Sequence, residues 1–154
     1  MDLAVTIWAP LGGGLLTGRY GTDRERPEDT RLAGIGGRHE ENTLSRRNLA
    51  IDDAVNAVAA ERGVGATQVA IAWVLAQRRR RGVLIPIVGA RTEAQLRDNL
   101  GALEVGLIAD ELGWLDEASR IEPGFPHDFG GARLAYGETL DLIDDHRALV
   151  EPLT

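Results

Sequence analysis

The residues best suited to chemistry lie where an apolar run gives way to a helical pattern. In the stretch VLIPIVGARTEAQLRDNL, residues 83–100, this corner carries Gly89, Arg91 and Thr92. A glycine lets a ligand approach the backbone, and a guanidinium fork suits phosphate oxygens. A helix that begins at Thr92 would add unpaired N–H groups and about half a positive charge. The corner therefore indicates an anion site, although a simple reading stays open in which Gly89 is a tight turn and Arg91 is solvated.

A second candidate site follows an apolar run near the N-terminus. Residues 3–8, LAVTIW, are rich in β-branched and aromatic side chains and predict a buried strand. The following residues, APLGGGLLTGRYG, contain proline and glycines that let the backbone approach a ligand or another chain closely. Residues 22–44 are polar, with one proline and three glycines, and predict a long loop.

Helices and a second strand can be placed around these two segments. Apolar residues at helical spacing predict helices at residues 45–62, 67–79, 109–119 and 139–150. Residues 83–88 predict a second buried strand. The T-x-x-Q pattern from Thr92 to Gln95 predicts a capping box at the start of one more helix.

This order of elements is typical of β/α units with parallel strands. Parallel strands occur in sheets that are covered on both faces, and two strands cannot make such a sheet alone. We therefore expect further strands to come from elsewhere. A length of 154 residues corresponds to about one domain. Because that domain would lack strands, we expect residues 1–154 to form a single incomplete domain.

Composition argues against several classes of partner. The net charge of −7 disfavours broad contact with nucleic acid or an anionic membrane. The arginine run at residues 77–82 is most simply the solvated end of a helix. No apolar run approaches the roughly 20 residues of a membrane span. Because the chain has no cysteine, a cytoplasmic location is the simplest expectation.

Other kinds of catalytic site find little support in the sequence. His127 and His146 lie near aspartates but in no metal-binding pattern, so we interpret them as turn and surface residues and expect no metal. The two serines, Ser45 and Ser119, lie in no G-x-S-x-G sequence. The glycines at 12–14 do not form a G-x-G-x-x-G motif within a strand–helix unit.

The segments IWAPLGGGLLTGRY and IPIVGARTEAQLRDNLGAL closely resemble the C-terminal portion of the aldo-keto reductase family. Members of that family typically show an aromatic-Ser-Pro-Leu stretch, a glycine-rich loop and a Leu-Thr-Gly-Lys-Tyr-like segment. Later they show an Ile-Pro-Gly-Ala/Ser segment, followed by Gln and Asn on a helix. The resemblance covers roughly residues 4–130 in the same order. It implies a partial (β/α)8 TIM barrel that comprises the last two β/α units and the C-terminal helices.

The resemblance also implies that the chain binds NADP(H). Trp8 matches the aromatic residue that stacks on the nicotinamide ring. The loop along the pyrophosphate matches Ala9, Pro10, Leu11, Gly12 and Gly14, with a basic position at Arg19. Gly89 and Arg91 match residues at the adenosine phosphate, so the anion predicted above would be the 2′-phosphate. The adenine end matches Gln95, Asp98 and Asn99.

Spacing and two departures bear on this site. Residues 91, 95, 98 and 99 are expected on one face of a helix, because they follow at i, i+4, i+7 and i+8. Ala9 stands where the family often has serine, which removes a hydroxyl that could bond phosphate. Arg19 stands where lysine is common, and the two are not interchangeable at a fitted site.

The family's catalytic residues are a larger departure. Aldo-keto reductases use Asp, Tyr, Lys and His from the first part of the barrel, with a hydride from the nicotinamide. All 17 basic residues of this chain are arginine, so it cannot supply that tetrad intact. Reduction of a small aldehyde or ketone would therefore require another segment or chain to complete the barrel and cover its strand edges. A non-catalytic NADP- or phosphate-binding module and an inactive truncated remnant remain as alternatives.

Overall fold

A parallel pair of short strands forms the sheet of this protein. The computed structural model describes residues 4–25, 27–28, 30–35, 37–77 and 83–122. Strand β1 (Val5–Ile7) pairs with β2 (Leu84–Pro86) in parallel, with Ile7 opposite Pro86. The predicted parallel pairing is confirmed, and both strands are shorter than expected. The predicted helix at 139–150 lies outside the described residues, as do His127 and His146.

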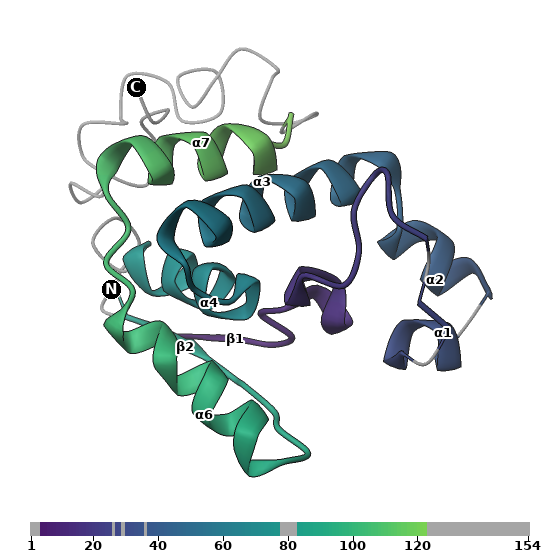
Figure 1. Ribbon diagram of the computed structural model, residues 1–154, viewed down its shortest axis with the longest axis horizontal. Helices are drawn as coiled ribbons and strands as arrows, with labels where there is room; N and C mark the ends of the chain where they lie inside the picture. Colours follow the sequence, from purple (N-terminus) through teal and green to yellow (C-terminus); the bar gives the residue numbers. More distant parts are fainter. Residues whose placement is uncertain (1–3, 26, 29, 36, 78–82, 123–154) are drawn as a thin grey trace, which may run out of the picture.

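Helices make up most of the described chain (Figure 1). They are α1 (Arg31–Ile35), α2 (Gly37–Thr43), α3 (Arg46–Arg62), α4 (Ala66–Ala76), α6 (Glu93–Gly101) and α7 (Ala109–Ser119), with short 3-10 helices η1 (Gly12–Thr17) and η2 (Ala102–Glu104). Helix α4 packs on β2 and on α6, and α3 lies between α4 and α7. Helices α1 and α2 lie to one side, where α1 contacts η1.

The bounds of α3 follow from its caps. The hydroxyl oxygen of Ser45 accepts a hydrogen bond from the backbone N–H of Asn48 at 3.3 Å, which satisfies one of the free donors of the first turn. Gly63 ends the helix with a φ of 65°, a left-handed conformation that glycine adopts without steric cost. The helix predicted at 45–62 is thereby confirmed.

The long loop predicted for residues 22–44 is wrong, because this region contains α1 and α2. The hydroxyl of Thr30 accepts from the N–H of Ala33 at 3.2 Å, so it acts as a local cap. Leu32 is only 1% exposed and packs in a small cluster with Leu15, Tyr20 and Leu44. Two buried leucines, Leu32 and Leu44, thus fix a segment that is otherwise polar and rich in glycine.

Both strands were expected to be buried, and this is also wrong. Val5 is 48% exposed and Ile85 is 47% exposed. Because residues opposite each other in a parallel pair point to the same face, Thr6 and Ile85 share one face, whereas Val5 and Leu84 share the other. Helix α4 covers one side of β2, and Thr6 and Ile85 both remain exposed. These strands therefore carry more apolar side chains than the other described residues cover.

The main core lies between α3, α4 and α7 rather than on the sheet. Its fully buried members are mostly small: Ala54, Val55, Val58, Ala59, Ala66, Val69, Ala70 and Leu115. Val58 and Val69 are 0% exposed. Small side chains let α3 and α4 approach closely, and Leu115 brings α7 into the same cluster.

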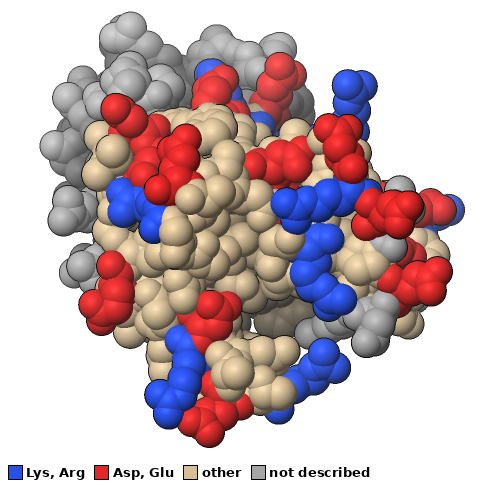
Figure 2. All heavy atoms as spheres, viewed as in Figure 1, with Lys and Arg blue, Asp and Glu red and all other residues tan. Residues whose placement is uncertain are grey.

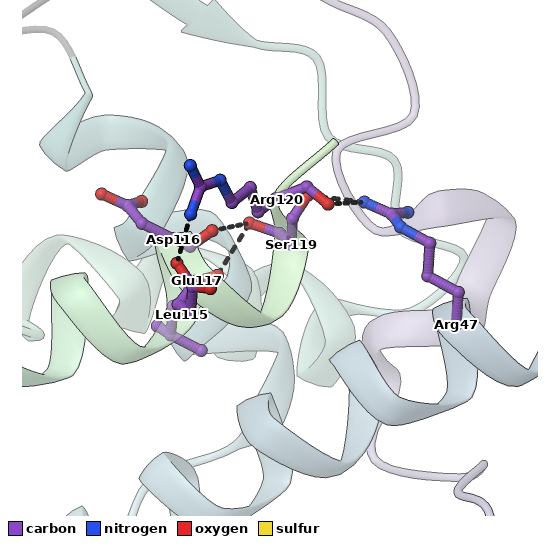
Figure 3. Close-up of polar contacts among 6 residues, drawn as sticks. All are labelled: Arg47, Leu115, Asp116, Glu117, Ser119 and Arg120. Carbon is purple, nitrogen blue, oxygen red and sulfur yellow. Dashed lines mark hydrogen bonds and ion pairs between the residues drawn. The ribbon is translucent and has the colours of Figure 1, made fainter. Parts of the chain in front are cut away.

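Polar contacts hold α7 antiparallel to α3 at both ends. Near the start of α3, Arg47 Nη2 donates to the carbonyl oxygens of Ser119 at 2.6 Å and Arg120 at 3.1 Å (Figure 3). At the other end, Arg62 donates to both carboxylate oxygens of Glu111, at 2.5 and 2.6 Å. This guanidinium lowers the pKa of Glu111. The pairing of the helix ends fixes the register of α7.

Charge on the molecular surface is mixed. In the face shown in Figure 2, acidic and basic side chains of the described residues are interspersed, and an uncharged area lies between them. Among the described helices, none is both long enough and apolar enough to cross a membrane.

The position of Leu115 predicts a large loss of stability on truncation. Leu115→Ala should lower the free energy of unfolding by about 2–5 kcal/mol, because it removes a buried side chain and leaves a cavity between α7 and α3. Leu103→Ala is the matched control, since Leu103 is 68% exposed, and it should change stability by less than about 0.5 kcal/mol. Urea denaturation followed by circular dichroism measures both. Equal effects would contradict the proposed docking of α7.

Candidate functional site

Strand pairing brings the two predicted segments to one edge of the sheet. The backbone N–H of Val5 donates to the carbonyl of Val83 at 2.8 Å, and that of Ile87 donates to Ile7 at 2.9 Å. Because the strands are parallel, their carboxyl ends lie side by side. The glycine loop that follows Trp8 and the corner at Gly89 therefore start from neighbouring strand ends, which is where α/β folds commonly bind ligands.

The glycine loop is shaped by consecutive left-handed residues. Gly12, Gly13 and Gly14 have φ values of 58°, 71° and 107°. Ala9 also has a positive φ of 51°, which costs a non-glycine residue about 1–2 kcal/mol. The carbonyl of Ala9 accepts from Gly12 N–H at 2.9 Å, and that of Leu11 accepts from Gly14 at 3.0 Å. These bonds turn the chain sharply as soon as it leaves β1.

One side of this loop is packed and the other is open. A Cβ on Gly13 would lie 3.3 Å from Cδ2 of Leu32, whereas a Cβ on Gly14 would meet no heavy atom of the described residues within 4 Å. Leu11 packs partly against the main core, and Pro10 is half-buried. Trp8 is 80% exposed, so its ring is available for stacking on a flat ligand.

The corner after β2 is held by side chains of α6. Asn99, which is 7% exposed, donates from Nδ2 to the carbonyl of Gly89 at 3.3 Å. Gln95 accepts at Oε1 from the backbone N–H of Arg91 at 2.8 Å. Thr92 caps the helix as predicted, by accepting from Gln95 N–H at 3.2 Å. The capping box is only half confirmed, because the Gln95 side chain bonds to Arg91 N–H rather than to Thr92.

The corner leaves room for an anion beside one arginine. A Cβ on Gly89 would meet nothing within 4 Å among the described residues. Arg91 is exposed and lies two residues before α6, and its guanidinium has no hydrogen-bond or ion-pair partner in the described part of the chain. Arg19, which follows the glycine loop directly, is also exposed. The corner thus combines open backbone, a guanidinium and a helix N-terminus.

The expectation that residues 91, 95, 98 and 99 share a helical face is only partly met. Gln95 and Asn99 both bond to the corner, but Asp98 turns toward α4, where its Oδ1 accepts from Nε2 of Gln68 at 3.0 Å. Adjacent residues point about 100° apart on a helix, so Asp98 and Asn99 cannot both face the corner. Arg91 lies before the helix and is positioned by the loop.

Two features of the site had no clear signal in the sequence. The positive φ of Ala9 could not be predicted from the sequence, because alanine rarely adopts a positive φ. The bond from Asn99 to Gly89 shows that this amide supports the corner, a role that depends on how α6 docks. An exposed aromatic ring, an open glycine loop and a guanidinium with no partner among the described residues thus lie at one sheet edge, which fits a flat ring joined to phosphates.

Sequence comparison with known proteins identifies a family for this chain. The sequence profile described as the Aldo/keto reductase family matches residues 1–120. Aldo-keto reductase ausK of Emericella nidulans is 32% identical over 130 residues, which covers 84% of this chain and 31% of that protein. Norsolorinic acid reductase B of Aspergillus parasiticus is 30% identical over 126 residues, which covers 81% of this chain and 32% of that protein.

This chain therefore spans about a third of the length of these two relatives. The family profile itself covers most of the chain, including β1, the glycine loop, β2, the Gly89 corner and the helices up to α7. On this sequence evidence, the chain belongs to the aldo/keto reductase family.

Proposed function

We propose that the sheet edge between Trp8 and Gly89 binds NADP(H). The observation that carries this proposal is the parallel pairing of β1 and β2, because it places an open glycine loop beside an open corner with a guanidinium. The arrangement suits a dinucleotide, which has an aromatic ring at each end and phosphates between them.

Individual roles follow the resemblance to the family. The Trp8 ring would stack on the nicotinamide, and the backbone at residues 9–14 with Arg19 would lie along the pyrophosphate. Arg91 would bind the 2′-phosphate, and α6 would hold the adenine end through Gln95, Asp98 and Asn99. The bound cofactor would supply a hydride. Asn99 already donates to the carbonyl of Gly89 and would hold the corner in place, whereas Asp98 already accepts from Gln68 and would hold α6 on α4.

We further propose that residues 1–154 are a single incomplete domain, the last two β/α units and C-terminal helices of a (β/α)8 barrel. Exposed apolar side chains support this proposal. Ile85 on the open face of the sheet is 47% exposed. A leucine stripe at i, i+4 and i+7 along α6 and η2 is also exposed: Leu96, Leu100 and Leu103. Further strands and helices would cover both surfaces.

Within a completed barrel, the reaction would be NADPH-dependent reduction of an aldehyde or ketone to an alcohol. The proton donor would come from the completing segment, since this chain has no lysine to pair with a catalytic tyrosine. Tyr20 is 4% exposed within the cluster of Leu15, Leu32 and Leu44, so it is badly placed to donate a proton to a substrate. A cytoplasmic location stays an expectation from the cysteine-free composition.

A second function, binding of NADP or another phosphate ligand without turnover, is favoured by the same observations. The chain carries an open anion corner, whereas its described tyrosine is buried and it contains no lysine. A third outcome, an inactive remnant, would follow if the exposed apolar surfaces prevent a stable fold. Cofactor binding and turnover, measured separately, distinguish the three.

Titration of the purified chain with NADPH tests the cofactor site. Tryptophan emission should be quenched saturably, more strongly than with NADH, because Trp8 is the exposed ring at the site. Arg91→Ala should weaken NADPH binding at least about tenfold, since a hydrogen bond to a charged group contributes about 1.5–3 kcal/mol.

Arg97→Ala is the matched control for that titration. Arg97 lies on α6 and pairs with Glu93 at 2.7 Å, so its loss should leave NADPH affinity unchanged. An affinity that is equal for NADPH and NADH and insensitive to Arg91 would contradict the assignment of the 2′-phosphate. The absence of any saturable quenching would contradict the autonomous binding module.

Complementation tests the proposed barrel. An N-terminal fragment of a family member that carries the Asp, Tyr, Lys and His should restore NADPH oxidation with an aldehyde when it is mixed with this chain. Leu100→Glu should reduce that activity at least about tenfold, because it places a charge in the surface to be covered.

Ala50→Glu serves as the control for a general effect of added charge. Ala50 is exposed on α3, away from the sheet and α6, and its replacement should leave complementation intact. A fragment whose catalytic tyrosine is replaced by phenylalanine should associate without restoring turnover. Equal losses for Leu100→Glu and Ala50→Glu would contradict the proposed barrel interface.

A further inference from the structure

One carboxyl group of α3 is buried, and only one of its two oxygens has a hydrogen-bond partner among the described residues. Asp52 is 0% exposed, and its Oδ2 accepts from Nδ2 of Asn56 at 3.0 Å. Its other oxygen, Oδ1, has no hydrogen-bond partner within the part of the chain that the structure describes. A buried carboxylate with an unpaired oxygen is costly, whereas the neutral acid is tolerated more easily. The proposed cofactor site makes no use of this group.

The neighbours of Asp52 hold the segment that follows the glycine loop. Asp53 accepts from the N–H of Thr22 at 3.2 Å and from its hydroxyl at 2.6 Å. Asn56 lies against Gly18, where an added Cβ would come within 3.1 Å of Asn56 Oδ1. Arg24 donates to the carbonyl of Gly18 at 2.5 Å. Residues 18–24, which include Arg19, thus lie on the polar face of α3 that contains Asp52.

The same segment has room to move. Tyr20, Thr22 and Arg24 line a cavity of about 140 Å³ together with Leu44 and Leu49. Few apolar contacts hold the segment apart from Tyr20, so its attachment depends on the bonds to α3.

The ionisation of Asp52 is opposed by its surroundings. Burial is the main cause that raises the pKa of Asp52 from 3.8 to about 6, and the hydrogen bond from Asn56 acts in the other direction. The charged groups that act on it among the described residues are Asp53, which raises the pKa, and Arg24, which lowers it. Both belong to the contact between α3 and residues 18–24.

We propose that proton binding by Asp52 controls how firmly residues 18–24 are held on α3. The neutral acid fits the buried position and keeps the segment closed over the cavity. The carboxylate gains stability when the segment opens and admits water, which also loosens the end of the glycine loop at Gly18. This inference concerns the fold of the loop and applies whether or not a cofactor binds.

The direction of the pH effect follows from proton linkage. The unfolded chain releases the Asp52 proton near its ordinary value of 3.8, and the folded chain retains it up to about 6. Between these values the folded chain binds more protons than the unfolded chain, so the stability due to Asp52 falls as the pH rises.

Asp52→Asn tests the proposal, because the amide is neutral and keeps an oxygen for Asn56. The variant should match the wild type near about pH 4 and be more stable at about pH 7.5. The ratio of the two unfolding constants should change about a hundredfold across that range, since one pKa unit is a factor of ten. In the wild type, amide hydrogens of residues 18–24 should lose protection at the higher pH, and in the variant they should keep it.

Asp53→Ala is the control, since it removes both acceptor oxygens for Thr22 and should expose residues 18–24 at both pH values. The wild-type carboxyl of Asp52, followed by carbon-13 NMR, should titrate near about pH 6, a measurement that needs no variant. An ordinary titration near about pH 4, or protection of residues 18–24 that is independent of pH, would overturn the proposal. Neither readout involves NADPH, so failure here is separate from failure of the proposed function.

Discussion

The parallel pairing of β1 and β2 is the constraint on which the rest of the site depends. Its register sets Ile7 opposite Pro86, so both chains leave the sheet at the same edge. The glycine loop and the Gly89 corner are separated by most of the described chain, and no contact local in sequence could bring them together. The helices between them act as the crossover of a β/α unit, with α4 packed on β2.

That crossover is stable enough to position the strands because its helices are fastened to one another. Small residues bring α3 and α4 together, and Arg47 and Arg62 hold the two ends of α7. The carboxylate of Glu111, which binds Arg62, also accepts a hydrogen bond from the backbone N–H of Ile108 at 2.8 Å and so satisfies a free donor at the start of α7. One side chain thus serves both a helix cap and an interhelical bond, which ties the start of α7 to its register on α3.

Sequence reasoning succeeded where the signal was local and failed where it was not. The two ends of α3 could be predicted from Ser45 and Gly63, because an N-terminal cap and a left-handed glycine each act within one helical turn. Helices α1 and α2 were missed because Leu32 and Leu44, which anchor this region, are buried in a cluster with Leu15 and Tyr20, a contact that is not local in the sequence. Strand burial was overestimated because it depends on neighbours that the described chain does not provide. The residues of the candidate site stay a prediction from the sequence, whereas the direction of Asp98 and the φ of Ala9 are seen only in the fold.

The difference between local and distant contacts also explains why one chain can carry a well-ordered corner at Gly89 and an open apolar surface. Bonds within α6 and its preceding loop hold the corner, through Asn99 to Gly89 and Gln95 to Arg91, and they need no further strand. The open sheet face and the leucines of α6 and η2, in contrast, expose side chains that water solvates poorly. The proposed cofactor binding and the proposed completion of the barrel would therefore rest on different contacts, so each could be lost while the other remains. A chain with this distribution of contacts would recognise a dinucleotide through local geometry, whereas reduction of a carbonyl would depend on whatever covers its apolar face.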